Sequence, residues 1–155
     1  MKQAYVLALL ACLFHLPANA EQCQVTVRTS DQLQFDQTDI HLPPKCTQVA
    51  LILVHTGTLS ADVMGHNWVL TRRDDSADVA QAGIQAGRDH DFVPLNDQRV
   101  IAHTHLIGGG QTTRIQFSTR GLKPGQPYTY FCSFPGHTSL MKGQLTYDSI
   151  HLGGA

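Results

Sequence analysis

A short segment near the end of the chain gathers three side chains that bind soft metals. Cys132, His137 and Met141 lie within ten residues, and a further histidine, His66, lies far upstream. A thiolate, two imidazoles and a thioether form a soft-to-borderline ligand set that suits copper in its Cu(I) and Cu(II) states. A trigonal plane of two histidines and a cysteine, with a weak axial methionine, is the ligand pattern of electron-transfer copper sites. The sequence therefore predicts a copper site if these four side chains meet in space.

The residues between these ligands fit a compact loop. A strand that ends at Cys132 and another that starts near Met141 can bring both ends of their connection to one point. The loop contains Pro135 followed by Gly136, a rigid residue before a permissive one, so that the next histidine can fold back to the same centre. Upstream, Gly65 has no Cβ, and its backbone carbonyl can approach a metal closely as a second weak axial ligand.

The first 20 residues have the features of an export signal. Lys2 supplies a positive start, residues 5–16 are mostly apolar, and Ala18-Asn19-Ala20 fits the small-x-small cleavage pattern. The apolar run is too short to span a bilayer. We expect a mature chain that begins at Glu21 and is exported to a periplasm. A weak lipoprotein-like pattern leaves lipidation of Cys12 open as an alternative.

Composition narrows the choice of partners. The net charge is −1 and only 15% of residues are charged, so there is no basic excess to bind nucleic acid or to hold the protein on an anionic membrane. A neutral surface suits a protein that docks transiently, and we expect a monomer without membrane insertion. Residues 21–148 are predicted to form a single domain, and the tail at 149–155 receives no role.

The cysteine count points to the same site. After removal of the signal, Cys23, Cys46 and Cys132 remain, and an odd number in an oxidising compartment leaves one thiol outside a disulfide. Cys23 and Cys46 stand at the starts of two strand-like segments, and pairing them closes a loop of roughly two dozen residues, worth about 3 kcal/mol. The remaining Cys132 lies beside histidine and methionine, and metal ligation would keep its thiol from exchanging with the disulfide.

The mature chain is rich in short strand patterns. Strands are predicted at residues 24–28, 47–55, 67–71, 100–104, 113–117, 128–132 and 143–147. Gly108-Gly109-Gly110 and Pro124-Gly125 indicate turns between them. Many short strands separated by turns predict an all-β sandwich or barrel.

Residues 74–87 are the exception. They are rich in alanine, carry acidic residues at their start and end at Gly87, which predicts one short helix inserted between strands. Gly83 in the middle of the segment disfavours a helix.

Three segments resemble the azurins, which are bacterial cupredoxins. They are residues 63–70, 99–104 and 131–143, and the resemblance runs over nearly all of 21–147. The Cys-x4-His-x3-Met spacing is particular to azurins, since plastocyanins and amicyanins place the histidine closer to the cysteine. The resemblance implies a Greek-key β-sandwich that holds one type 1 copper and passes single electrons between periplasmic redox proteins, with no enzymatic activity of its own.

The resemblance also assigns roles to residues. His66, Cys132 and His137 match the equatorial copper ligands, with Met141 as the axial thioether and Gly65 as the axial carbonyl. Asn67 matches the residue that ties the two ligand loops together near the cysteine sulfur, and Phe134 follows a backbone N–H that also reaches that sulfur. Such contacts tune the metal.

The resemblance further implies an apolar docking patch around the exposed edge of one histidine ligand. Leu33 and Ile84 replace what is often methionine there, so the shape of the patch is expected to differ while its apolar character remains. Redox partners implied by the family are a c-type cytochrome, nitrite reductase or a similar periplasmic oxidoreductase. The patch residues are Leu33, Leu59, Val63, Met64, Ile84, Pro135, Gly136, Ser139 and Leu140.

Two other functions remain as alternatives. Copper storage or delivery uses similar ligands, but it favours exposed and readily exchanged ones. An enzyme with Cys132 as nucleophile needs a base that a third group orients, and no such group stands in the motif. A second, adventitious metal site at His103 and His105 is also conceivable, because alternate residues of a strand share one face.

Overall fold

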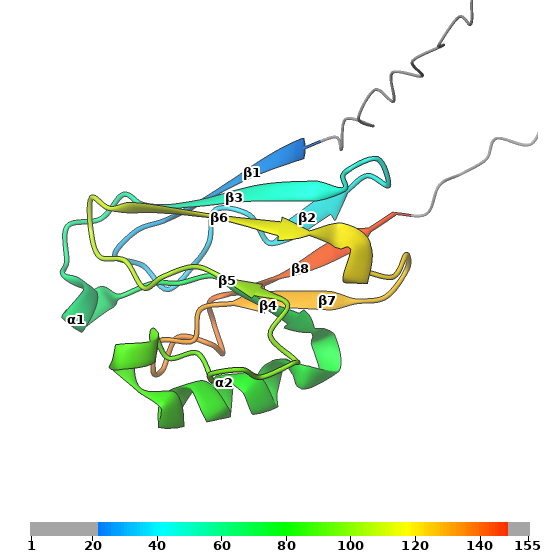
Figure 1. The fold of residues 1–155 in the computed structure, drawn as a ribbon. Helices are drawn as coiled ribbons and strands as arrows, with labels where there is room; N and C mark the ends of the chain where they lie inside the picture. Colours follow the sequence, from blue (N-terminus) through cyan, green and yellow to red (C-terminus); the bar gives the residue numbers. More distant parts are fainter. Residues whose placement is uncertain (1–21, 149–155) are drawn as a thin grey trace, which may run out of the picture.

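The computed structural model describes residues 22–148, which form two β-sheets packed face to face with a helix on the outside (Figure 1). The predicted signal peptide (1–20) and tail (149–155) lie outside the described residues. The strands are β1 Gln22–Thr29, β2 Asp39–Leu42, β3 Gln48–His55, β4 Val69–Arg72, β5 Ala102–His103, β6 Thr112–Ser118, β7 Tyr128–Phe131 and β8 Lys142–Tyr147. The helical segments are α1 Ala61–Met64, η1 Arg73–Asp75, α2 Ser76–Ala86, η2 Arg88–His90 and η3 Thr119–Gly121. Between residues 22 and 148 no helix is long and apolar enough to cross a membrane.

The strands divide into a sheet of order β1-β3-β6 and a sheet of order β2-β8-β7-β4-β5. The β1–β3 and β2–β8 pairs are parallel and the other pairs are antiparallel. Many neighbouring strands are distant in sequence, as Greek-key connections require. The prediction of an all-β sandwich with an inserted helix is therefore confirmed.

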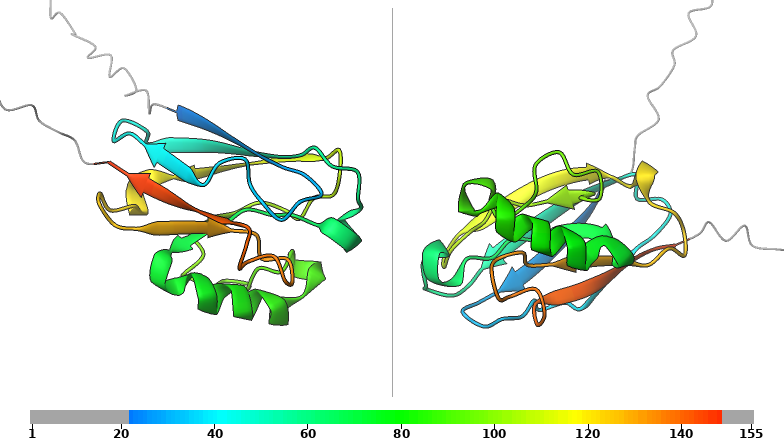
Figure 2. Two further views of the ribbon diagram at one scale, coloured as in Figure 1. Left: turned by 180° about the vertical axis from the view of Figure 1, so that it is seen from behind. Right: turned by 90° about the horizontal axis from the view of Figure 1, so that it is seen from below.

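Helix α2 covers the outer face of the five-stranded sheet (Figures 1 and 2). Val79 and Ala80 of the helix pack against Val69 of β4 and Phe131 of β7. All four residues of β7 are buried, because the other sheet covers one face and the helix covers the other. The strand that leads into Cys132 is thus held from both sides.

Apart from shifts of one or two residues at strand ends, the structure differs from the predicted strands in two places. β2 was not predicted, because its four residues carry too short an alternation to be distinguished from a loop. The strand predicted at 100–104 is confined to Ala102–His103, which pairs only with Val69 and Leu70 of β4. Beyond this pairing the backbone N–H of Thr104 still donates to the carbonyl of Trp68, so the chain remains beside β4 without regular register.

The predicted disulfide between Cys23 and Cys46 is present. It joins the start of β1 to the loop that precedes β3. These two strands run parallel from that end, so their far ends, at Thr29 and His55, lie side by side at the opposite end of the sandwich. The candidate metal ligands lie near this second end.

Gly83 has a packing role in α2, which explains a glycine inside a helix. It is buried, and a Cβ at this position would overlap the backbone carbonyl oxygen of Phe92. Helix propensity alone predicts that Gly83→Ala stabilises the protein by about 1 kcal/mol. We expect the opposite, a loss of about 1–3 kcal/mol in the free energy of unfolding. The added Cβ would clash with backbone atoms, which cannot shift as a flexible side chain can.

Chemical unfolding followed by the fluorescence of Trp68, the single tryptophan, measures this effect. The matched control is Gln81→Ala on the exposed side of the same helix, which should change stability by no more than about 0.5 kcal/mol. A gain in stability for Gly83→Ala would show that α2 can move away from the backbone at Phe92 without a cost in free energy.

Candidate metal centre

Three of the predicted ligands meet in the structure. One ligand atom each from His66, Cys132 and His137 lies within 4.8 Å of the other two, and all three residues are buried. No other group of three or more potential metal ligands of the His, Cys, Asp and Glu types exists within residues 22–148. The Cys132 Sγ lies 3.8 Å from Nδ1 of His66 and 3.6 Å from Nδ1 of His137.

These distances fit a shared metal ion. With zinc bond lengths as a guide, about 2.3 Å to sulfur and 2.0–2.1 Å to nitrogen, a trigonal plane requires sulfur–nitrogen separations of about 3.8 Å. The carbonyl oxygen of Gly65 lies 3.8 Å from the Cys132 Sγ, which brings a fourth donor to the same centre. The donor set is the soft one that copper favours.

His66 is held by backbone on two sides. Its N–H and C=O form a reciprocal pair of 2.9 Å hydrogen bonds with Ile107, and its Nε2 lies 2.8 Å from the carbonyl oxygen of Ser30. Because a carbonyl only accepts, Nε2 carries the hydrogen, and in the neutral ring the lone pair is on Nδ1, the atom nearest the Cys132 sulfur. Burial lowers the pKa of His66 to about 4, so the ring is neutral at pH 7 and ready to ligate.

The loop between the other ligands is closed by its own backbone. The Cys132 N–H donates to the carbonyl of Met141 at 3.0 Å, and the Met141 N–H donates to the carbonyl of His137 at 2.8 Å. Gly136 has a φ of 85°, a left-handed conformation that favours glycine. Met141 is fully buried at the end of this loop, and its role as the axial ligand stays a prediction. The expectation that Cys132 and Met141 lie at one point is confirmed for their backbones.

Burial also controls the protonation of the Cys132 thiol. It raises the pKa of Cys132 to about 12, while hydrogen bonds from the backbone N–H groups of Asn67 and Phe134 act in the opposite direction. The pKa of His137 is likewise lowered by burial. Without a metal the thiol is therefore protonated at neutral pH, and a bound cation must displace that proton.

Asn67 connects the two ligand segments. Its Oδ1 accepts from the Ser133 N–H at 2.9 Å, and its Nδ2 donates to the Ser133 hydroxyl at 2.8 Å and to the Asp91 carbonyl at 2.7 Å. Asn67 and Ser133 follow His66 and Cys132 in sequence, so these bonds tie the two ligands together. This is the contact that the family resemblance implied for Asn67.

The Asp91–Phe92 pair was missed by the sequence analysis. Both residues have a φ of 55°, which costs energy in residues other than glycine. The Asp91 carboxylate accepts from the Leu106 N–H at 3.0 Å and lies 2.8 Å from Nδ1 of His105. The Phe92 ring packs edge-on against the Phe134 ring, with the two ring centroids 5.4 Å apart. Only the tertiary structure shows that this strained turn supports both Asn67 and Phe134.

The predicted docking patch is largely at the surface. His137 is 6% exposed, whereas Leu140 is 67%, Val63 60%, Ile84 44% and Leu59 40% exposed. Ile84 of α2 lines one hollow together with Gly136, Thr138 and Ser139 of the ligand loop. The other patch residues are exposed (Pro135, Gly136 and Ser139) or half-buried (Leu33 and Met64).

The ring nitrogens of His55, His103 and His105 contact other groups. The Nε2 of His55 donates to the carbonyl of Met64 at 3.0 Å and its Nδ1 accepts from the Gly57 N–H at 3.1 Å, so neither nitrogen is available to a metal. His103 and His105 direct their Nδ1 atoms to different partners, a backbone carbonyl and a carboxylate. Within residues 22–148 neither histidine belongs to a group of three or more potential metal ligands.

Comparisons with known proteins agree with this geometry. A family model described as copper-binding proteins of the plastocyanin/azurin family matches residues 21–148. The chain is 45% identical over 139 residues to azurin of Bordetella pertussis, covering 90% of this chain and 92% of that protein. It is 43% identical over 137 residues to azurin of Pseudomonas aeruginosa, covering 88% and 93%.

Among solved structures, azurin (Az-iso2) from Methylomonas sp. strain J superimposes with a TM-score of 0.79 at 41% identity, over 82% of this chain and 98% of that one. This likeness confirms the predicted cupredoxin fold. The matches extend over nearly the whole described chain and include the segments that bring His66, Cys132 and His137 together. The chain belongs to the plastocyanin/azurin family of copper-binding proteins.

Proposed function

We propose that the protein is a mobile one-electron carrier with one type 1 copper per chain. The observation that carries the proposal is the buried approach of the Cys132 Sγ to the Nδ1 atoms of His137 and His66, at 3.6 and 3.8 Å. His66, Cys132 and His137 are the equatorial ligands, with Met141 and the Gly65 carbonyl as weak axial ones. Copper bound there would supply a Cu(I)/Cu(II) couple.

The protein's own contribution is to hold the ligands still. Backbone hydrogen bonds fix His66 on one side and close the 132–141 loop on the other, and Asn67 joins the two. Ligands held in this way move little between oxidation states, which favours fast electron transfer. Burial keeps water away from Cys132.

The apolar surface around His137 is the proposed docking site. Its exposed side chains carry no charge, which suits small, transient interfaces. Proposed partners are a c-type cytochrome, nitrite reductase or a similar periplasmic oxidoreductase. Export after removal of residues 1–20, a single domain at 21–148, a monomeric state and a tail without a role belong to the same proposal.

An enzymatic role for Cys132 is not part of it. A nucleophilic cysteine is activated as a thiolate in an accessible, electropositive setting. Cys132 is fully buried and its pKa is raised.

Electron self-exchange distinguishes a carrier from a storage or delivery protein. We expect the copper-loaded protein to show a one-electron couple and self-exchange that is much faster than the loss of copper to a chelator. Slow self-exchange with fast copper release would support delivery instead. Line broadening in mixtures of the two oxidation states measures the first rate, and bleaching of the visible band in excess chelator measures the second.

Two matched leucines test the docking patch in the same assay. Leu140→Asp places a carboxylate on the patch, and in self-exchange two such patches must face each other, so the rate should fall by at least about tenfold. Leu95 is equally exposed, at 65%, but lies outside the patch, and Leu95→Asp should change the rate less than about twofold. Equal slowing by both variants would contradict the assignment of the patch.

A further inference from the structure

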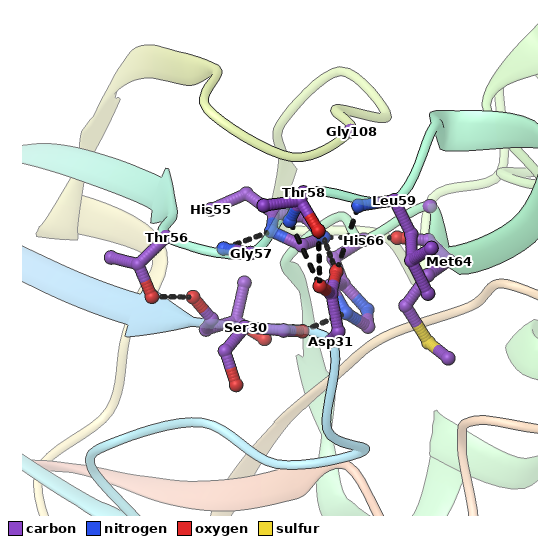
Figure 3. Close-up of polar contacts among 12 residues, drawn as sticks. Ser30, Asp31, His55, Thr56, Gly57, Thr58, Leu59, Met64, His66 and Gly108 are labelled. Carbon is purple, nitrogen blue, oxygen red and sulfur yellow. Dashed lines mark hydrogen bonds and ion pairs between the residues drawn. The ribbon is translucent and has the colours of Figure 1, made fainter.

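The ring Nε2–H of the buried ligand His66 points to a backbone carbonyl in a turn that several hydrogen bonds hold (Figure 3). Ser30, which supplies this carbonyl, follows β1, and the segment that packs beside it, 56–59, follows β3. Thr29, on one side of Ser30, accepts two hydrogen bonds at its carbonyl from Thr56, at 2.8 Å from N–H and 2.9 Å from the hydroxyl.

Asp31, on the other side of Ser30, binds the same segment through its carboxylate. Oδ2 accepts from the N–H of Thr58 at 2.8 Å and from its hydroxyl at 3.2 Å, and Oδ1 accepts from the N–H of Leu59 at 3.1 Å. The hydrogen bond from the Thr58 N–H is the largest cause of the lowered pKa of Asp31. The carboxylate is therefore ionised at neutral pH and accepts all three hydrogens.

Gly57 makes this approach possible. A Cβ at this position would overlap the Asp31 carboxylate. The side chain of Asp31 thus fills the space that the glycine leaves, and the turns after β1 and β3 are joined directly.

The peptide group connects these contacts to the metal ligand. The Ser30 carbonyl and the Asp31 Cα belong to one planar peptide unit, so anchoring the Asp31 side chain limits how that plane can rotate. With Thr29 anchored on the other side, the Ser30 carbonyl is fixed between two attachments to one segment. The acceptor for His66 is therefore fixed before any metal binds.

We propose that Asp31 is a positioning residue of the metal centre, which holds the Ser30 carbonyl against the Nε2–H of His66 and so keeps Nδ1 directed at the Cys132 sulfur. The inference rests on the proposed function of this site. In metal sites, the partner of a ligating histidine's second nitrogen fixes its tautomer and ring orientation, and losing such a partner typically lowers metal affinity about 10- to 100-fold.

An ion pair with His55 does not explain Asp31. The Asp31 carboxylate lies 4.0 Å from the His55 Nε2, but that nitrogen already donates to the Met64 carbonyl at 3.0 Å. The three shorter bonds to Thr58 and Leu59 are the ones that the carboxylate makes.

The test compares four full-length mature proteins: wild type, Asp31→Ala, Asp31→Asn and Asp36→Ala. Asp36 is the matched control, because its carboxylate also accepts a backbone N–H, that of Arg28 at 2.7 Å, without a bond to the 56–59 segment. The first measurement is solvent exchange of the His66 Nε2–H by NMR, in the diamagnetic Cu(I) protein and in the metal-free protein. The second is the dissociation constant for Cu(I) in competition with a chelator.

For Asp31→Ala we expect exchange of the His66 Nε2–H to accelerate at least about tenfold, and the dissociation constant to rise about 10- to 100-fold. Asp31→Asn keeps one acceptor oxygen for a backbone N–H, so both the exchange rate and the dissociation constant should change less than in Asp31→Ala. Asp36→Ala should match wild type within about twofold in both measurements.

Exchange in Asp31→Ala within twofold of wild type would overturn the proposal. So would equal effects of Asp31→Asn and Asp31→Ala, since that pattern shows a role of charge alone. If Asp31→Ala fails to fold, Gly57→Ala replaces it, because its Cβ displaces the Asp31 carboxylate, and with it the backbone nitrogen of Asp31, while the charge is retained. The metal-free measurement stands even if the wild-type protein lacks a one-electron couple, so failure of the proposed function is recognised separately.

Discussion

Cys132→Ser is expected to abolish the intense visible absorption of the Cu(II) protein. That band requires a thiolate bound to copper, and the Cys132 Sγ lies 3.8 and 3.6 Å from the Nδ1 atoms of His66 and His137. A serine hydroxyl is a hard ligand that does not ionise at neutral pH and has no comparable charge-transfer transition. Affinity for Cu(I), which prefers soft sulfur ligands, should fall by several orders of magnitude.

Absorption spectra and copper analysis of the purified variant measure the result. The fold should survive, because serine is smaller than cysteine and the hydrogen bond from the Cys132 N–H to the Met141 carbonyl remains. Ser139→Ala, an exposed change in the same loop, is the control that should keep the full band. If Cys132→Ser keeps the band and the one-electron couple, the ligand assignment is wrong.

The sequence predicts three residues that the fold brings together, because residue types alone indicate their chemistry. Cysteine, histidine and methionine at this fixed spacing are typical of a soft-metal centre, and the odd cysteine count separates Cys132 from the disulfide pair. Helix α2 was also predictable, at 74–87 against the observed Ser76–Ala86, since its alanines and its final glycine act locally. Local signals need no tertiary information.

The residues that hold the ligands in place could not be predicted from the sequence, for a physical reason. Ser30 contributes a backbone carbonyl to His66 from 36 residues away, and any residue type offers the same atom. Asp91 contributes its carbonyl to Asn67 in the same way. Asp31 is one acidic residue among several until the fold brings the turns after β1 and β3 together. Such contacts follow from strand register, which short alternating patterns specify weakly.

Asn67→Leu is expected to cause the largest loss of stability at the site. Leucine has a similar volume, but it removes three hydrogen bonds and leaves the Ser133 N–H, the Ser133 hydroxyl and the Asp91 carbonyl without this partner. Asn67 is completely buried and Ser133 nearly so, which limits compensation by water. At about 0.5–1.5 kcal/mol for each of the three bonds, the free energy of unfolding should fall by about 1.5–4.5 kcal/mol.

Denaturant unfolding of the metal-free protein, followed by Trp68 fluorescence, measures this loss without the contribution of copper binding. Gln85→Leu, an exposed amide on α2, is the matched control and should change stability by about 0.5 kcal/mol or less. Ser133→Ala removes only the hydroxyl contact, so combining it with Asn67→Leu should cost less than the sum of the two single changes. Additive costs, or an Asn67→Leu protein as stable as its control, would mean that the loops carrying His66 and Cys132 are joined by something other than this side chain.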